Sequence, residues 1–350
     1  MIRPRPRPRH LLPAALAAAA LLAGCSTPAP AAPSSTTVTV TNCGTPAQFP
    51  VPANKVFVND GNLISMMLAL GAQGSVTAVS SMQRDADTLR RHYGTGPVDG
   101  LKQVAPEYPS LETVLAQSPD VMVAGWNYGY SEAKNVTPAG LREKGIAPYV
   151  LTESCRQEQG QKARGIVDPW TALRDDLANL GAITGRTEQA ATVNADIGAR
   201  LAALRSAPQA ATPPTVFLFD SGTDAVFSSG RFGAPEGIIT AAGARNALTD
   251  VEDTWTEVSW ERVAASNPAA FVFVDYPPET IQQKIATLRN RDGVRDLPAV
   301  QQGRFLNLPY ALWTSGPLNI DAAEQIRKAL EGWQLVPAST ITPEFDDVLR

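Results

Sequence analysis

Histidine is nearly absent from this chain of 350 residues, which contains only His10 and His92. A transition-metal site built from several imidazoles would therefore lack ligands. A serine hydrolase would have to use His92 as its base, and the chain contains no Gly-x-Ser-x-Gly sequence. His-Glu-x-x-His and Walker A sequences are missing too, and the glycines between Gly94 and Gly100 have the wrong spacing for a dinucleotide loop. The sequence therefore predicts a protein that is not an enzyme and has no resident metal or cofactor.

Cysteine is also scarce, with three residues at Cys25, Cys43 and Cys155. Leu22-Ala-Gly-Cys25 follows an arginine-rich start and an apolar stretch too short to span a bilayer, and it resembles the lipobox of bacterial lipoproteins. We expect residues 1–24 to be a lipoprotein signal peptide and Cys25 to be lipidated. The alternative is a plain secretory signal that is cleaved near Gly24.

The two remaining cysteines, Cys43 and Cys155, are expected to form a disulfide, because exported proteins seldom keep free thiols. Two unpaired thiols are the alternative.

No excess of basic charge is present. The chain has 30 Lys and Arg against 34 Asp and Glu, and removal of residues 1–24 would remove four Arg and no acid, so that the formal charge becomes 26 − 34 = −8. This balance gives no reason to expect a nucleic-acid partner.

The folded part shows a repeated pattern of apolar strands and helices. Residues 25–42 are rich in Pro, Ala, Ser and Thr and are expected to be a tether. Strands and helices alternate over residues 43–166 and again over 207–350, which predicts two Rossmann-like α/β lobes with mainly parallel sheets. Residues 167–206 have only helical periodicity and predict a long helical crossover, with Gly181 and Gly185 as possible break points. A ligand cleft is expected between the lobes, beyond the carboxyl ends of the strands.

One segment occurs twice. Ser110-Leu-Glu-Thr-Val-Leu-Ala-Gln-Ser-Pro119 returns as Ser259-Trp-Glu-Arg-Val-Ala-Ala-Ser-Asn-Pro268, and each copy leads into an apolar strand. Each serine stands where a helix N-cap is expected, which places Glu112 and Glu261 in the first turn of a helix. A glutamate at that position also stabilises its own helix end, by about 0.3–1 kcal/mol.

These features together resemble the class III substrate-binding proteins of ABC importers, the receptors for ferric siderophores, haem and cobalamin. The resemblance covers nearly the whole mature chain and includes residues 177–186 (LANLGAITGR) and 238–246 (IITAAGARN). It implies that Glu112 and Glu261 dock on arginines of a membrane permease, that partner ATPase subunits supply the energy, and that the lobes move little. It also implies a monomer on the outer face of the cytoplasmic membrane.

Candidate ligand contacts are aromatic and cationic residues just beyond predicted strand ends. A flat, partly anionic chelate needs aromatic faces for its apolar body and guanidinium groups for its carboxylate or catecholate oxygens. The set expected to bind the ligand is Arg84, Trp126, Tyr128, Arg231, Trp255, Tyr276 and Trp313. Further candidates are Asn59, Asp60, Met82, Phe232 and the segment from Tyr310 to Trp313. Each aromatic could instead cover the core, and each arginine could be a solvated surface group.

The function predicted is a lipid-anchored receptor that binds an iron–siderophore complex and delivers it to an ABC permease, with iron present only inside the chelate. A receptor for cobalamin, haem or another small molecule is an alternative. A surface sensor that does not serve transport, or a lipid-anchored hydrolase, would be a different class of protein.

Overall fold

The computed structural model describes residues 36–158 and 160–349, so the predicted signal peptide and Cys25 lie outside the described residues. The N-terminal lobe is built on a parallel sheet in which β6 pairs with β3, β7 and β8. Its strands are β3 (Val56–Asn59), β4 (Val76–Ser80), β5 (Gln103–Ala105), β6 (Val121–Trp126), β7 (Gly129–Tyr130) and β8 (Ala147–Val150), in the order β5-β4-β3-β6-β7 with β8 beside β6. Its helices are α1 (Gly61–Ala69), η1 (Gln73–Ser75), α2 (Ala86–Tyr93), α3 (Thr95–Asp99), α4 (Leu111–Ala116), α5 (Pro138–Glu143) and η2 (Thr152–Ser154).

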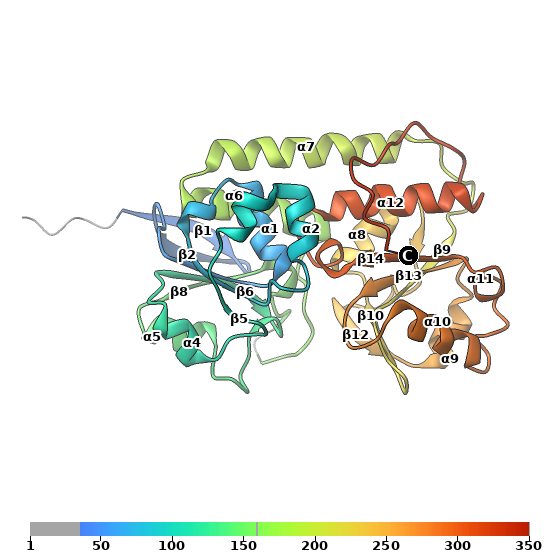
Figure 1. The fold of residues 1–350 in the computed structure, drawn as a ribbon, viewed down its shortest axis with the longest axis horizontal. Coiled ribbons are helices and arrows are strands. Elements are labelled where there is room, and N and C mark those ends of the chain that lie inside the picture. The colour runs from blue at the N-terminus through green and yellow to red at the C-terminus, as the bar shows by residue number, and fades with distance from the viewer. Residues whose placement is uncertain (1–35, 159, 350) are drawn as a thin grey trace, which may run out of the picture. The chain divides into compact units, whose positions relative to one another are not determined.

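The C-terminal lobe repeats this plan with a smaller sheet (Figure 1). Its parallel strands are β9 (Thr215–Phe219), β11 (Arg245–Asn246), β13 (Ala270–Asp275) and β14 (Phe305–Pro309), in the order β11-β9-β13-β14. An antiparallel pair joins β10 (Val226–Ser229) to β12 (Trp255–Val258). The helices are α8 (Ala234–Ala241), α9 (Trp260–Ser266), α10 (Ile281–Asn290), α11 (Pro298–Gln301), η3 (Tyr310–Leu312) and α12 (Asn319–Gly332). Two α/β lobes with parallel sheets are the fold class that the sequence predicts.

The predicted tether ends earlier than expected. Strand β1 (Thr37–Asn42) forms an antiparallel hairpin with β2 (Thr45–Pro50), and Val40 and Phe49 are buried in it. Alternating Thr and Val residues are typical of a half-buried strand. The strand was not predicted because these residues directly follow a Pro- and Ser-rich stretch and were included in the tether. Residues 37–42 therefore belong to the folded part.

Two helices, α6 (Pro169–Thr184) and α7 (Thr187–Ser206), occupy the predicted crossover. Asp168 caps the start of α6 by accepting a hydrogen bond from the backbone N–H of Thr171. Gly185 ends it in the left-handed conformation with φ 70°, which glycine adopts without strain. The 20 residues of α7 span roughly 30 Å, and Figure 1 shows α7 running from the N-terminal to the C-terminal lobe.

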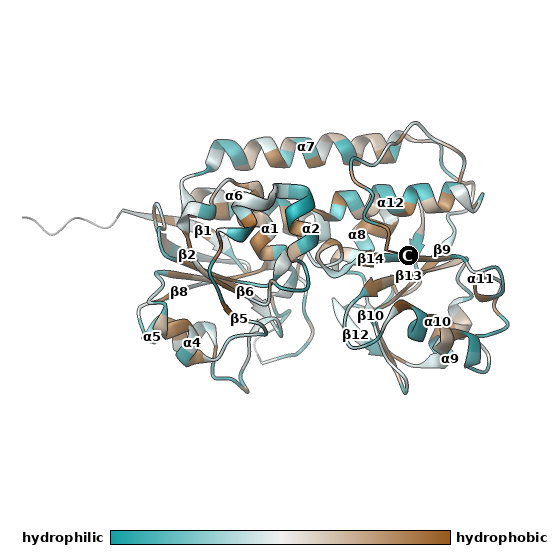
Figure 2. Cartoon of the chain, viewed as in Figure 1, coloured by the Kyte–Doolittle hydropathy of each residue, from teal (hydrophilic) through white to brown (hydrophobic). Residues whose placement is uncertain are grey.

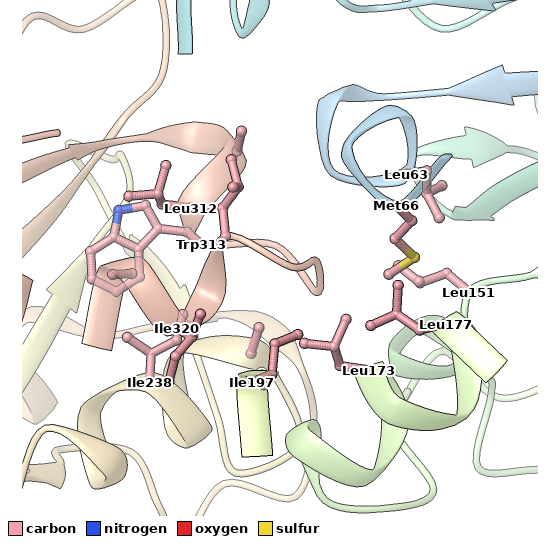
Figure 3. Packing of buried hydrophobic residues seen from close by; sticks show 14 of the residues in the cluster. Leu63, Met66, Leu151, Leu173, Leu177, Ile197, Ile238, Leu312, Trp313 and Ile320 are labelled. Carbon is pink, nitrogen blue, oxygen red and sulfur yellow. The ribbon is translucent and has the colours of Figure 1, made fainter. Parts of the chain in front are cut away.

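One apolar core continues through both lobes. Leu63 of α1, Leu177 of α6, Ile238 of α8 and Trp313 belong to the same cluster of buried side chains, and Figure 3 shows these residues along its length. Most strands of both sheets, such as β9, β13 and β14, are hydrophobic (Figure 2). The two lobes therefore share one close-packed apolar core.

A buried carboxylate adds polar contacts to this junction. Glu153 of η2 is 1% exposed, and it accepts hydrogen bonds from three donors of the C-terminal lobe. The donors are the backbone N–H of Ser315 (2.8 Å), the indole N–H of Trp255 (3.0 Å) and the backbone N–H of Ala234 (3.4 Å). Burial raises the pKa of Glu153 to about 6, although these hydrogen bonds oppose the rise.

We expect Glu153→Gln to lower the free energy of unfolding at pH 7 by about 1–3 kcal/mol, because the new amide N–H₂ faces donors and leaves one unsatisfied. The folded-state pKa of Glu153 lies above its ordinary value of 4.5. Its favourable contribution is therefore complete below about pH 4.5 and is lost as the pH rises through about 6. The stability difference between wild type and Glu153→Gln should accordingly narrow over that range in urea denaturation. The exposed Glu158→Gln is the control, and equal stability of both variants would contradict the prediction.

Candidate functional site

A cavity of about 400 Å³ lies where the two sheets present the carboxyl ends of their strands. Tyr108 follows β5, Tyr128 follows β6, Asp220 follows β9, Tyr276 follows β13 and Tyr310 follows β14. The remaining lining residues come from β10, β12 and connecting loops, and they are Asn127, Lys162, Arg164, Ser221, Phe227, Asp253, Trp255, Thr256 and Thr314. Both lobes contribute, which matches the place expected for a ligand cleft.

Aromatic rings form much of the wall. Trp255 is 7% exposed and stacks on Phe227, with ring centroids 6.0 Å apart and an angle of 25° between the ring planes. Tyr276 lies against Tyr310 with centroids 4.9 Å apart. Such faces suit the apolar body of an organic ligand.

Two glycines shape the loop that carries Tyr128. A Cβ atom on Gly125 would lie 2.0 Å from the Tyr128 ring, so only glycine lets the ring pack over this backbone. Gly129 has φ +113°, and a Cβ there would lie 2.6 Å from that of Ala124. Burial raises the pKa of Tyr128 well above its usual value, so its phenol is neutral.

Arg84 does not line the cavity. Its guanidinium is 3.0 Å from the carboxylate of Asp60, and its side chain is 14% exposed. It lies 4.8 Å from the ring centroid of Tyr276 and 5.0 Å from that of Tyr310, so it sits behind the tyrosine wall as a structural cation. Asp60 also approaches the hydroxyl groups of Tyr108 (3.3 Å) and Tyr310 (3.2 Å).

Three other predicted contacts lie outside the cavity. The half-buried ring of Trp126 is covered by Arg156, whose guanidinium carbon is 3.8 Å from the ring centroid. Arg231 is exposed and pairs with Glu252 at 3.1 Å. Trp313 is fully buried and donates its indole N–H to the carbonyl of Phe273. Of the predicted set, the structure brings Tyr128, Trp255 and Tyr276 together on the cavity wall.

Charged residues that the sequence did not single out also line the cavity. Lys162 and Arg164 lie on the loop that follows Cys155, and no strand or helix pattern marks that loop. Arg164 donates to the carbonyls of Trp126 (3.3 Å) and Trp255 (2.7 Å), so it connects the two lobes. Asp220 directly follows the apolar strand Thr215–Phe219, a signal that would have identified it.

The next observations concern a metal site and a histidine-dependent hydrolase. In residues 36–158 and 160–349 no group of three or more His, Cys, Asp and Glu side chains is arranged to hold a metal ion. His92 does not line the cavity; it contacts Asp347 at 2.9 Å, and its ring lies tilted against that of Phe345 with centroids 4.0 Å apart. None of the helices within these same residues has the length and apolar character needed to cross a membrane.

The repeated segments form matching helix ends. Ser110 caps α4 by accepting from the backbone N–H of Thr113, and Ser259 caps α9 by accepting from that of Arg262. Both glutamates, Glu112 and Glu261, are exposed. The pKa of Glu112 is lowered first by its own backbone N–H, and that of Glu261 first by the Ser259 hydroxyl. Figure 1 shows α4 and α9 on the side of the two lobes away from α7.

A family model described as periplasmic binding protein matches residues 60–312, which is more than half of the chain. The chain belongs to the periplasmic binding protein family. This confirms the resemblance deduced from the sequence and, because the family consists of binding proteins, the prediction that the chain is not an enzyme.

The chain is distantly similar to vitamin B12-binding proteins. The vitamin B12-binding protein of Salmonella typhimurium is 24% identical over 165 residues, which are 47% of this chain and 54% of that protein. The chain thus spans about half the length of the curated relatives it matches.

Solved structures confirm the fold. A periplasmic binding protein from Veillonella parvula superposes with a TM-score of 0.69 at 22% identity, covering 85% of this chain and 98% of the other. An ABC-type Fe3+-hydroxamate transport system protein from Saccharomonospora viridis gives 0.67 at 22% identity, covering 84% and 98%. At this identity the likeness concerns the fold alone.

Proposed function

We propose that this protein is the solute receptor of an ABC importer and that it binds an iron–siderophore complex in the cavity between its lobes. The observation that carries the proposal is the aromatic cavity at the carboxyl ends of both parallel sheets. Its ligand contacts are the predicted Tyr128, Trp255 and Tyr276, together with Tyr108, Phe227 and Tyr310 from the same wall. Arg84, Trp126, Arg231 and Trp313 are left out, because none of them lines the cavity.

The proposal includes delivery at a membrane. Cys25 carries the lipid anchor on the outer face of the cytoplasmic membrane, and Glu112 and Glu261 dock on the permease. The matching N-caps, the exposure of both glutamates and their placement on one side of the lobes support docking on a single partner.

Ligand titration tests the receptor function. We expect saturable quenching of tryptophan fluorescence when the purified protein is titrated with ferric hydroxamates or ferric catecholates. Trp255→Phe should weaken binding roughly fivefold, since loss of an aromatic contact costs about 1 kcal/mol. Trp126→Phe is the matched control and should bind with unchanged affinity, because Trp126 lies outside the cavity.

The same panel separates the alternatives. Haem and cobalamin belong in it, and the curated B12-binding relative makes cobalamin the second candidate. Binding of cobalamin or haem alone would reject the siderophore and keep the receptor. No response to any of the compounds would reject the proposed function.

A further inference from the structure

The charge of the cavity differs from what an anionic chelate needs. The sequence offered Arg84 and Arg231 as partners for a carboxylate or catecholate, but Arg84 is paired with Asp60 and Arg231 with Glu252. Arg164 does line the cavity, yet its terminal N–H groups donate to the carbonyls of Trp126 and Trp255, and its guanidinium lies 4.0 Å from the carboxylate of Asp253. Lys162 is exposed at the cavity rim, where solvent screens its charge.

Asp220 brings a carboxylate into the cavity instead. It is 4% exposed, and it lies where β9 ends, between the walls contributed by Tyr276 and Phe227. Asp253 also lines the cavity, but its carboxylate accepts from the backbone N–H groups of Arg164 (3.0 Å) and Thr254 (2.7 Å).

Asp220 is set apart from the other buried acids by its hydrogen bonding. Asp60, Asp85, Glu153 and Asp176 each accept a hydrogen bond from a backbone N–H group. The remaining buried acids accept from arginine or histidine side chains, and they are Asp321, Glu324 and Asp347. In the part of the chain that the structure describes, no backbone N–H donates to the carboxylate of Asp220. The carboxylate thus retains acceptor capacity on the cavity side.

The nearest cation does not use up this capacity. Lys284 of α10 is 1% exposed and does not line the cavity. Its ammonium donates to the carbonyls of Val274 (2.5 Å) and Tyr276 (3.5 Å). Burial raises the pKa of Asp220 to about 6, while Lys284 and the Ser221 hydroxyl oppose the rise. At pH 7 the carboxylate of Asp220 is therefore mostly ionised, and it lines the cavity.

A buried ionised acceptor favours one kind of ligand over another. It binds a hydrogen-bond donor or a cationic group strongly and repels negative charge, and both effects are large in a site that excludes water. A ferric tris-catecholate is tri-anionic. A ferric tris-hydroxamate is neutral, and some carry amide N–H groups or a protonated amine.

Resting on the function proposed above, we infer that Asp220 selects the ligand by charge, so that the cavity takes a neutral or amine-bearing ferric tris-hydroxamate and disfavours a tris-catecholate. This reverses the preference for an anionic ligand that the arginines in the sequence suggested.

Three ferric chelates test the inference on the purified protein at neutral pH: ferrioxamine B, which is cationic, its neutral N-acetyl derivative, and the tri-anionic tris-catecholate ferric enterobactin. We expect the wild type to bind the cationic chelate about tenfold more tightly than the neutral one, and the tris-catecholate most weakly. Asp220→Asn keeps the shape of the side chain and removes its charge. It should reduce the preference for the cationic chelate to less than about twofold and strengthen binding of the tris-catecholate.

Asp275→Asn is the matched control, because Asp275 ends the neighbouring strand β13 but does not line the cavity. This variant should keep the wild-type ratio of affinities for the cationic and the neutral chelate. Asp220→Glu should keep it too, because it retains the charge. If the role of Asp220 were purely structural, Asp220→Asn would weaken the binding of all three chelates equally. An unchanged ratio of the affinities for the cationic and the neutral chelate in Asp220→Asn would overturn the inference. If that variant does not fold, tighter binding of the tris-catecholate than of both hydroxamates by the wild type would also overturn it. Failure of every chelate to bind would instead reject the proposed receptor function.

Discussion

The double substitution Cys43→Ser, Cys155→Ser is expected to lower the free energy of unfolding by about 4–5 kcal/mol. The structure confirms the predicted disulfide, which joins residues 112 positions apart. In the chain-entropy model a cross-link that closes so long a loop removes much of the freedom of the unfolded chain.

The position of the bridge adds to this effect. Cys43 is in the turn of the β1–β2 hairpin, and the neighbouring Asn42 exchanges two hydrogen bonds with the backbone of Val150. Cys155 is fully buried and begins the loop that carries Arg164 to the C-terminal lobe. Urea denaturation with and without a reducing agent checks the prediction. Reduced wild type should match the double variant, and a loss below about 1 kcal/mol would show that the bridge does not constrain the unfolded chain.

Reversing both docking charges is expected to abolish solute uptake and to leave ligand affinity unchanged. In the proposed complex Glu112 and Glu261 each meet an arginine of the permease, so Glu112→Arg with Glu261→Arg places like charges in contact, which costs several kcal/mol at an interface. Uptake of labelled ligand by cells should fall more than tenfold, and each single variant should have a smaller effect.

The control is another pair of exposed acids, both on α7. Glu188→Arg with Asp196→Arg makes the same change of net charge on that helix. This pair should transport normally, since α7 lies on the other side of the lobes (Figure 1). Normal uptake by the Glu112→Arg, Glu261→Arg protein would contradict docking on a permease through these glutamates and would favour a surface sensor.

Much of the fold could be predicted because its determinants are local. Apolar runs such as Ala270–Asp275, serine caps at Ser110 and Ser259, and a helical period over residues 169–205 depend on neighbours a few positions apart. Of the two glycines predicted as possible break points, Gly185 ends α6 in a left-handed conformation, which glycine adopts freely, whereas Gly181 lies inside that helix. The hairpin β1–β2 was missed, since its short strands follow a segment of tether-like composition.

The ligand site could be predicted only in outline. Tyr128 and Tyr276 were expected on the cavity wall because strand ends meet at one edge of a parallel sheet, and Trp255 joins them from β12. Arg84 and Trp313 have equally suitable chemistry but lie outside the cavity. Arg84 is held by an ion pair with Asp60, and Trp313 by a hydrogen bond to the carbonyl of Phe273.

The sequence alone therefore determined the duplicated helix ends, the alternation of strands and helices in both lobes and the cysteine pair, all of which depend on composition or on short-range pattern. Only the tertiary structure decided which charges face the cavity. That outcome depends on contacts between distant residues, such as Glu153 with Ser315 over 162 positions and Arg164 with Trp255 over 91. A polar side chain remains available to a ligand only where packing leaves it without a partner, and packing is a property of the whole fold.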